Sequence, residues 1–310
     1  MKINKPKFWD EKIGLISILL LPLTVIFISL SFLKKKLTIT RKFKLPIICV
    51  GNIYIGGTGK TPTSILLANE LSKLGKNPAI IRKYYSDHAD EYNLIKKGFK
   101  NLITKKNRID ALIEAEKTNF DVAILDDGLQ DNSIEKKLSI ICFNQNQLIG
   151  NGLVIPSGPL RENLFALKNA DIVIINGNRD KKFEEKILNV NKKLDIFYSF
   201  YKVENLDEFK GGKLLAIAGI GNPENFFQLI ENNNLKVEKK MVFPDHYKFS
   251  KNEIQKIIDN AKKNNYQLIM TEKDYYKINH YNLKNINYLK VSLEINGIKK
   301  ILNRIIDIHD

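Results

Sequence analysis

The chain has 310 residues, with 50 lysines and arginines against 34 aspartates and glutamates, so its formal net charge is +16. This length suits one large or two ordinary domains, and 44% hydrophobic with 27% charged residues excludes a largely disordered chain. Cys49 and Cys142 both lie inside apolar runs, which excludes the disulfide framework of a small secreted protein. A basic balance of this size is typical of proteins that bind nucleic acid, an anionic membrane or a phosphorylated substrate.

The basic charge is concentrated at the N-terminus. Residues 1–44 hold ten lysines and arginines and two acidic residues, which is half of the excess charge. Between two basic clusters, residues 13–33 form a run of 21 without a charge, 15 of them Leu, Ile, Val or Phe. A helix of that length rises about 30 Å, which matches the hydrocarbon core of a bilayer. We therefore expect an N-terminal membrane helix, with the body of the protein on the cytoplasmic side because more basic residues follow the run than precede it.

Two other interpretations of this segment are less favoured. A cleavable signal peptide would have a shorter apolar core and a small-residue cleavage site, whereas Phe32 and Leu33 lead directly into Lys34. A buried soluble helix would usually carry a polar stripe, and the polar residues of this run are scattered. The basic flanks would also attract anionic lipid headgroups.

A glycine-rich segment follows the basic residues. Residues 46–50 predict a short buried strand, residues 56–61 read Gly-Gly-Thr-Gly-Lys-Thr, and the apolar spacing after them predicts a helix. This is the arrangement of a P-loop, in which backbone N–H groups and a helix N-terminus surround phosphate oxygens. Lys60 would reach the terminal phosphates of ATP, and the Thr61 hydroxyl would ligate Mg²⁺. The predicted nucleotide-binding residues are Tyr54, Ile55, Gly56, Gly57, Thr58, Gly59, Lys60 and Thr61.

The match to the strict P-loop pattern is incomplete, because its first position is Tyr54 rather than glycine. The alternative is a turn that is merely rich in glycine, and it leaves Lys60 and Thr61 at a helix start unexplained. We therefore favour the nucleotide site.

A second predicted strand supplies the acidic residues that such a site needs. Residues 121–125 are mostly apolar and lead into Asp126, Asp127 and Gly128. On its own this is a common turn, but it lies some 65 residues after Thr61, where a P-loop protein places the carboxylate near Mg²⁺. We therefore predict Asp126 as a metal ligand together with Thr61, and Asp127 as a catalytic residue together with Lys60.

Further predicted strands alternate with helical patterns. They lie at residues 79–82, 138–143, 171–176, 213–218 and 267–270. This alternation predicts an α/β fold with mostly parallel sheets and helices on both faces. The expected organisation is an N-terminal membrane anchor with basic flanks at 1–44, a P-loop-type α/β/α sandwich domain at 45–205, and a second, smaller α/β/α domain at 206–310.

Three other features are candidates for a role. Arg161 ends a turn-rich segment at 150–162 and could contact a phosphate, because loops at strand ends carry the sites of α/β proteins. Ser250 and Thr271 are each followed three residues later by an acidic residue, which predicts two capped helices. His246 stands in a Pro-Asp-His sequence, where residue chemistry alone gives only a weak indication of function.

Six motifs occur in the order found in the tetraacyldisaccharide 4'-kinase family, and the chain resembles that family over nearly its whole length. They lie at residues 50–62, 126–130, 156–162, 218–227, 243–246 and 271–274. The resemblance implies a kinase of the inner (cytoplasmic) membrane, with its catalytic domains facing the cytoplasm. It would transfer the γ-phosphoryl group of ATP to the 4'-hydroxyl of a tetraacyldisaccharide 1-phosphate in lipid A biosynthesis. Its cofactors would be ATP and Mg²⁺, and its partners this anionic glycolipid and the membrane, with no nucleic acid.

The resemblance also implies roles for single residues. By motif position, Asp90 and His246 match an Asp-His pair that activates the sugar hydroxyl, and both are predicted catalytic residues. A carboxylate within reach of a hydroxyl can accept its proton while a second group orients the carboxylate. Arg82 matches an arginine at the start of a loop in this family, and it joins Arg161 as a candidate substrate contact.

The chain departs from the family pattern at two places. Residues 82–85 read Arg-Lys-Tyr-Tyr where the family has Arg-Gly-Tyr-Gly. Asp131 stands where the family has histidine, which replaces an imidazole near the predicted site with a negative charge.

Two other functions fit parts of the sequence. A membrane-associated P-loop ATPase or GTPase would hydrolyse nucleotide without a lipid acceptor, and it would have no use for Asp90 or His246. A membrane-tethered nucleic-acid-binding protein would need basic residues interleaved with aromatic ones, or a recognition helix, and we find neither. The lipid kinase explains the apolar run, the glycine loop and the basic flanks together.

Overall fold

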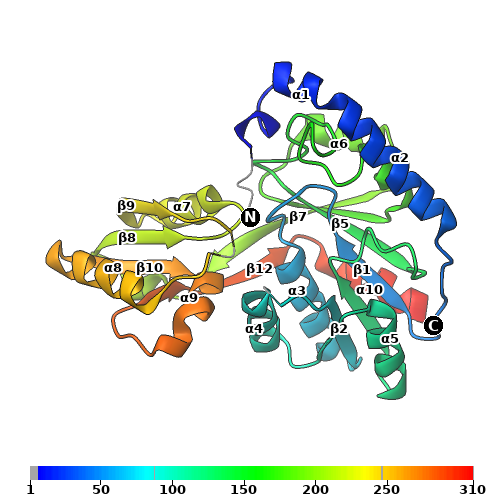
Figure 1. The fold of residues 1–310 in the computed structure, drawn as a ribbon. Coiled ribbons are helices and arrows are strands. Elements are labelled where there is room, and N and C mark those ends of the chain that lie inside the picture. The colour runs from blue at the N-terminus through cyan, green and yellow to red at the C-terminus, as the bar shows by residue number, and fades with distance from the viewer. Residues whose placement is uncertain (1–5, 87, 246, 310) are drawn as a thin grey trace. The chain divides into compact units, whose positions relative to one another are not determined.

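The computed structural model describes residues 6–86, 88–245 and 247–309, and it confirms the predicted α/β fold with parallel sheets (Figure 1). The helices are η1 (Lys7–Trp9), α1 (Leu15–Leu19), α2 (Leu21–Leu37), α3 (Lys60–Lys73), α4 (Ala89–Gly98), α5 (Arg108–Lys117), η2 (Leu164–Asn169), α6 (Lys181–Leu188), η3 (Leu206–Phe209), α7 (Pro223–Asn232), α8 (Lys251–Lys263), α9 (Glu272–Ile278), η4 (Asn279–Tyr281) and α10 (Ile298–His309). The strands are β1 (Ile47–Gly51), β2 (Pro78–Lys83), β3 (Leu102–Lys105), β4 (Val122–Asp126), β5 (Leu138–Asn144), β6 (Ile172–Asn176), β7 (Asp195–Val203), β8 (Lys213–Ala218), β9 (Lys236–Val242), β10 (Tyr266–Thr271), β11 (Asn287–Leu289) and β12 (Val291–Ile295).

The chain divides into two compact units. Among the described residues, the larger unit contains residues 6–84, 101–200 and 295–309, and the smaller unit contains residues 85–100 and 201–294. The boundaries expected from the sequence follow the chain continuously, whereas these units do not. Helix α4 belongs to the smaller unit and α10 to the larger one.

The larger unit is built on an eight-stranded sheet with the order β12-β7-β6-β5-β1-β4-β2-β3. Strand β1 lies inside this sheet and pairs in parallel with β4 and β5, so that Val50 lies beside Asp126 and Ile140. All five residues of β1 are buried, as expected for a central parallel strand with helices on both faces. The carboxyl ends of β1 and β4 therefore meet at one edge of the sheet, where α/β proteins bind ligands.

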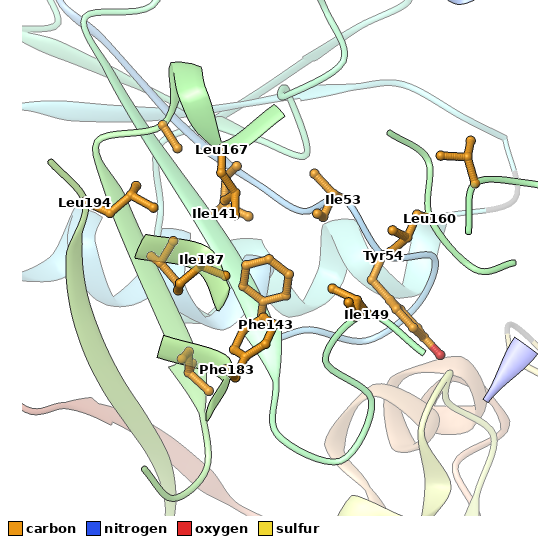
Figure 2. Packing of buried hydrophobic residues seen from close by; sticks show 14 residues of the cluster. Ile53, Tyr54, Ile141, Phe143, Ile149, Leu160, Leu167, Phe183, Ile187 and Leu194 are labelled. Carbon is orange, nitrogen blue, oxygen red and sulfur yellow. The ribbon is translucent and has the colours of Figure 1, made fainter. Parts of the chain in front are cut away.

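A cluster of 14 buried residues fills one face of this sheet (Figure 2). It joins β5 and β6 to α6, and the rings of Phe143 and Phe183 pack edge to face with their centroids 5.0 Å apart. Ile53 and Tyr54, which follow β1, belong to the same cluster, and Phe27 of α2 packs against it. The start of the glycine-rich loop is thereby anchored in the core.

The smaller unit has a four-stranded sheet with the order β11-β10-β8-β9. Alternate residues of β8 point to opposite faces, with Leu214 packed in the cluster that contains α7 and Leu215 in the cluster that contains α8. Both predicted helix caps in this unit are confirmed: Ser250 Oγ accepts from Glu253 N–H at 3.2 Å, and Thr271 Oγ1 accepts from Asp274 N–H at 3.1 Å.

The expected single membrane helix over residues 13–33 is wrong, because this segment forms two helices, α1 and α2, which meet at Leu20. Pro22 stands in the first turn of α2, where it has no N–H to donate to the carbonyl four residues earlier. Among the helices that the structure describes, none is both long and apolar enough to cross a bilayer.

Two polar residues of α1 and α2 face inward, whereas many of the apolar residues face outward. Ser17 and Thr24 are buried, whereas Leu15 is 73% exposed and Phe32 is 67% exposed. The Thr24 hydroxyl accepts from Ser157 N–H at 3.1 Å, and its oxygen lies 2.8 Å from Ser157 Oγ. In Figure 1 both helices run along the outer side of the larger unit. Their outward surface is therefore apolar, the reverse of an ordinary surface helix.

Candidate functional site

The loop between β1 and α3 has a backbone that requires glycine. Gly59, the residue before α3, has φ +89°, in the left-handed region that side chains disfavour. At Gly51 a Cβ atom would lie 2.5 Å from Leu129 Cβ, which is too close for any side chain. The glycines thus let the chain turn sharply and bring the α3 N-terminus, with its outward N–H groups, to the end of β1.

Asn52 holds this loop from inside. It is fully buried, and its Nδ2 lies 2.6 Å from the Tyr54 carbonyl oxygen, 3.2 Å from the Gly56 carbonyl oxygen and 3.0 Å from Thr58 Oγ1. Gln130 Nε2 donates to the Asn52 carbonyl oxygen at 2.9 Å, which connects the loop to the segment after β4. These contacts fix the loop before any ligand binds.

Lys60, Asp127 and Arg161 form one charged group beside the loop. Asp127 Oδ1 lies 3.7 Å from Lys60 Nζ and accepts from Arg161 Nη1 at 2.8 Å, and Arg161 also donates to Gln130 Oε1 at 3.2 Å. Burial lowers the pKa of Lys60, and the Asp127 carboxylate opposes that effect. Burial alone would raise the pKa of Asp127, but Lys60, Arg161 and Arg82 together outweigh it and hold this pKa well below its usual range. The carboxylate therefore stays ionised at neutral pH.

Asp126 lies at the end of β4 and is fully buried among three donors. Thr61 Oγ1 donates to its Oδ2 at 3.0 Å, Ser64 Oγ donates to its Oδ1 at 3.2 Å, and Arg82 Nη1 forms an ion pair with Oδ2. Arg82 also donates to Thr61 Oγ1 at 3.2 Å. Burial of a carboxylate is tolerated here because every oxygen is paired.

The oxygens of Thr61 and Asp126 suit Mg²⁺. Two neighbouring ligands of an octahedral Mg²⁺, each at about 2.1 Å, lie about 3.0 Å apart. The separation of Thr61 Oγ1 and Asp126 Oδ2 is 3.0 Å. Among the described residues there is no group of three or more His, Cys, Asp and Glu placed to hold a metal. The protein thus offers two oxygens, and water and phosphate oxygens would complete the shell, as Mg²⁺ sites commonly require.

The sequence analysis missed Arg108, the first residue of α5. Its Nη2 donates to the Asp127 carbonyl oxygen at 2.6 Å, and its Nη1 pairs with Asp131 Oδ2 at 3.2 Å. Asp127 has φ +59°, and the Arg108 contact supports this strained turn. The negative charge that Asp131 brings is neutralised by Arg108. Arg108 could have been recognised as a candidate site residue because it begins the helix that follows β3, at the carboxyl end of the sheet where α/β proteins bind ligands.

Six of the predicted site residues lie together in the larger unit: Lys60, Thr61, Arg82, Asp126, Asp127 and Arg161. Two predicted nucleotide contacts have other partners. Ile55 N–H donates to the Pro159 carbonyl oxygen at 2.9 Å, and the Tyr54 side chain is buried in the core cluster (Figure 2). The N–H groups from Gly56 onward are therefore the ones suited to phosphate.

The predicted Asp-His pair belongs to the smaller unit. Asp90 is the second residue of α4, but its side chain lies outside the described part of the structure, and so does the whole of His246. Their neighbours meet at one lysine: Lys273 Nζ lies 3.4 Å from Glu91 Oε1 and 3.1 Å from Asp245 Oδ1. Lys273 thus connects the helix that carries Asp90 with the segment that contains Asp245.

The fold and this site define a class of protein: a parallel α/β protein with a glycine-rich, phosphate-type loop between a central strand and a helix, and two aspartates on the adjacent strand. The chain belongs to the tetraacyldisaccharide-1-P 4'-kinase (LpxK) family, whose model matches residues 16–307. The family resemblance seen in the sequence is thereby confirmed.

Individual relatives agree with this assignment. A tetraacyldisaccharide 4'-kinase of Pelagibacter ubique (strain HTCC1062) is 43% identical, over 100% of this chain and 99% of the relative. Another from Rickettsia typhi (strain ATCC VR-144 / Wilmington) is 34% identical, over 96% of each chain. The fold resembles a crystal structure of LpxK from Aquifex aeolicus in complex with ATP, with TM-score 0.72 and 22% identity, over 96% of this chain and 100% of that one.

Proposed function

We propose that the protein is an ATP-dependent tetraacyldisaccharide 4'-kinase of lipid A biosynthesis. It transfers the γ-phosphoryl group of ATP to the 4'-hydroxyl of a tetraacyldisaccharide 1-phosphate. Family membership over nearly the whole chain supports this activity. One structural observation carries the chemistry: the cations Lys60, Arg82 and Arg161 converge with Asp126 and Asp127 beside the glycine loop.

This arrangement suits phosphoryl transfer, where positioning and charge neutralisation supply most of the acceleration. The loop residues 56–61 bind the phosphates through backbone N–H groups and the α3 N-terminus. Lys60 and Arg161 supply positive charge to the terminal phosphate. Mg²⁺, held by Thr61 and Asp126, would neutralise the remaining phosphate charge when bound. The two carboxylates are the partners of these cations and keep them in place.

The acceptor hydroxyl is activated by the pair Asp90 and His246. A sugar hydroxyl is a poor nucleophile at neutral pH, so its proton must pass to a base as the new O–P bond forms. Asp90 accepts this proton, and His246 orients the Asp90 carboxylate. At the same time the bond between the γ-phosphorus and the bridging oxygen breaks, and ADP leaves. Lys273 supports this assignment, because it connects the segments adjacent to both residues.

We also propose that the protein lies on the inner membrane, with its catalytic units on the cytoplasmic side, and the outward apolar surface of α1 and α2 supports this proposal. Leu15, Leu30 and Phe32 are all more than half exposed, and basic residues end α2. Such helices lie in the bilayer interface, with apolar side chains among acyl chains and basic residues near anionic headgroups. The acylated substrate resides in the same layer.

A phosphoryl-transfer assay tests the proposal. Purified protein, ATP, Mg²⁺ and a tetraacyldisaccharide 1-phosphate in mixed micelles should give one 4'-phosphorylated lipid for each ADP formed. Lys60→Ala should abolish transfer, whereas Lys73→Ala, an exposed lysine at the other end of α3, should not change it. Asp90→Ala and His246→Ala should lower turnover much more than ATP affinity. ADP formation without lipid product would instead indicate a membrane-associated NTPase.

A further inference from the structure

Tyr54 contacts the N-terminal segment through its hydroxyl. Its ring is fully buried in the cluster beside β5, and its hydroxyl oxygen points away from the labelled apolar side chains (Figure 2). This hydroxyl donates to Asp10 Oδ1 at 2.7 Å. Burial, followed by the Asp10 carboxylate, raises the pKa of Tyr54, so the hydroxyl is a donor at neutral pH. The glycine loop is therefore bonded to a residue 44 positions earlier in the chain.

Asp10 is held where it lies by its neighbour Trp9. Trp9 Nε1 donates to the Pro156 carbonyl oxygen at 2.9 Å, and the Trp9 carbonyl oxygen accepts from Asn151 N–H at 2.8 Å. The approach is close: a Cβ atom on Gly150, which has φ +56°, would lie 2.5 Å from the Trp9 carbonyl oxygen. Asp10 is thus fixed against residues 150–160, not carried on a loose terminal tail.

The same segment also pairs with the loop backbone on both sides of Tyr54. Arg161 N–H donates to the Ile53 carbonyl oxygen at 2.7 Å, and Ile55 N–H donates to the Pro159 carbonyl oxygen at 2.9 Å. The residues that follow are Gly56 and Gly57, which have no side chains to fix their own conformation. The position of the phosphate-binding N–H groups therefore depends on how firmly residues 53–55 are held.

We propose that Asp10 is a positioning residue for nucleotide binding: its hydrogen bond to Tyr54 makes the N-terminal segment part of the support of the glycine loop. The inference rests on the nucleotide site proposed above and adds a residue outside the P-loop motif. Asp10 touches no phosphate. It acts through Tyr54 by reducing the number of loop conformations that ATP binding must restrict, which is the general benefit of a pre-organised site.

A double-mutant cycle tests the contact. ATP dissociation constants are measured by titration calorimetry for the unaltered protein, Asp10→Ala, Tyr54→Phe and the double variant, together with kcat and Tm. Each single variant should bind ATP about fivefold more weakly, and the double variant also about fivefold, because all three lose the same hydrogen bond. Turnover at saturating ATP should be almost unchanged. Asp10→Asn keeps an acceptor and should bind ATP nearly as the unaltered protein does.

Tyr198→Phe is the matched control. Its hydroxyl donates to Glu184 Oε1 at 2.8 Å in the same unit, so the variant loses an equivalent hydrogen bond away from the glycine loop. It should lower Tm as Tyr54→Phe does and leave ATP affinity unchanged.

Three results would overturn the inference. The first is unchanged ATP affinity in both Asp10→Ala and Tyr54→Phe. The second is a double variant whose loss is the product of the single losses. The third is a Tyr198→Phe variant that binds ATP as weakly as Asp10→Ala and Tyr54→Phe do. If the unaltered protein binds no ATP, the proposed nucleotide site itself fails, and the inference fails with it.

Discussion

The Asp274 carboxylate is a fully buried charge in the smaller unit, and its removal gives a sharp prediction. It is fully buried, and its oxygens accept from Gly219 N–H at 2.7 Å, Thr271 Oγ1 at 2.7 Å and Lys277 Nζ at 2.6 Å. These bonds join α9 to the turn after β8. A Cβ atom on Gly219 would lie 2.9 Å from Asp274 Oδ1, so this turn needs glycine. We expect Asp274→Ala to destabilise the smaller unit severely.

The magnitude follows from what the substitution leaves behind. The side chain of Lys277 is only 8% exposed, so the alanine variant contains an almost buried ammonium group without its carboxylate, together with an unpaired backbone N–H at Gly219. Removing one partner of a buried ion pair costs about 3–5 kcal/mol. With each 1.4 kcal/mol worth a factor of ten, a loss of about 4 kcal/mol raises the population of the open state roughly a thousandfold.

Hydrogen exchange followed by mass spectrometry measures this opening locally. Peptides from β8 and α9 should exchange up to roughly a thousandfold faster in Asp274→Ala, whereas peptides from α3 in the larger unit should exchange at the same rate. The control is Asp259→Ala, the same substitution at an exposed position of α8, which should change exchange very little. Acceleration of less than about tenfold in β8 and α9 would refute the argument that this network holds the unit together.

Four further predictions concern other residues. Thr24→Val should lower the free energy of unfolding of the larger unit by about 1–2 kcal/mol, because the buried Ser157 N–H loses its acceptor; urea unfolding followed by Trp9 fluorescence measures this. Leu30→Ser should leave stability unchanged and weaken binding to anionic vesicles. Equal vesicle binding would count against a membrane role for the apolar surface of α1 and α2. Because the pKa of Asp127 is lower in the folded protein than its usual value, the ionised carboxylate stabilises the fold fully above that usual value, and this stability is lost progressively as the pH falls toward the depressed pKa. The unfolding free energy should therefore start to drop near about pH 5 and continue to drop at lower pH, less steeply in Asp127→Asn. Lys273→Met should lower turnover without changing ATP affinity, and Lys273→Arg should restore most of it; a methionine variant with normal turnover would exclude the positioning role of this lysine.

The sequence predicted the strands that are mostly buried and missed the edge strands β3, β9, β11 and β12, and also β7, which is not at an edge. Strands β1, β4 and β5 are buried throughout and read as apolar runs. Strand β9 carries exposed lysines at the edge of the smaller sheet, and such charge protects an open edge from pairing with another chain. Its hydrophobic pattern is correspondingly weak. Strand β7 lies inside the larger sheet, between β12 and β6, but only three of its nine residues are buried, so it lacks a continuous buried apolar run.

Some residues of the candidate site could likewise be predicted from the sequence, and others could not. Lys60, Thr61 and the two aspartates are recognisable because each lies in a short local motif with a physical role. Arg108 and Lys273 act on residues brought near them by folding, since Arg108 contacts a carbonyl 19 positions away and Lys273 a carboxylate 182 positions away. Periodicity and spacing carry no information on such pairs. Pro22, in the first turn of α2, was visible in the sequence as a possible helix start, but the length of the apolar run favoured a single helix.

The return of α10 to the larger unit has a consequence for how the protein is made. Helix α10 buries Ile301, Leu302 and Ile305 and contacts α3, the helix that begins at the glycine loop. A ribosome synthesises these residues after all of the residues of the smaller unit. We expect a nascent chain to hold its nucleotide site incomplete until α10 has left the ribosome, so that products truncated before α10 would bind ATP and the acylated substrate poorly.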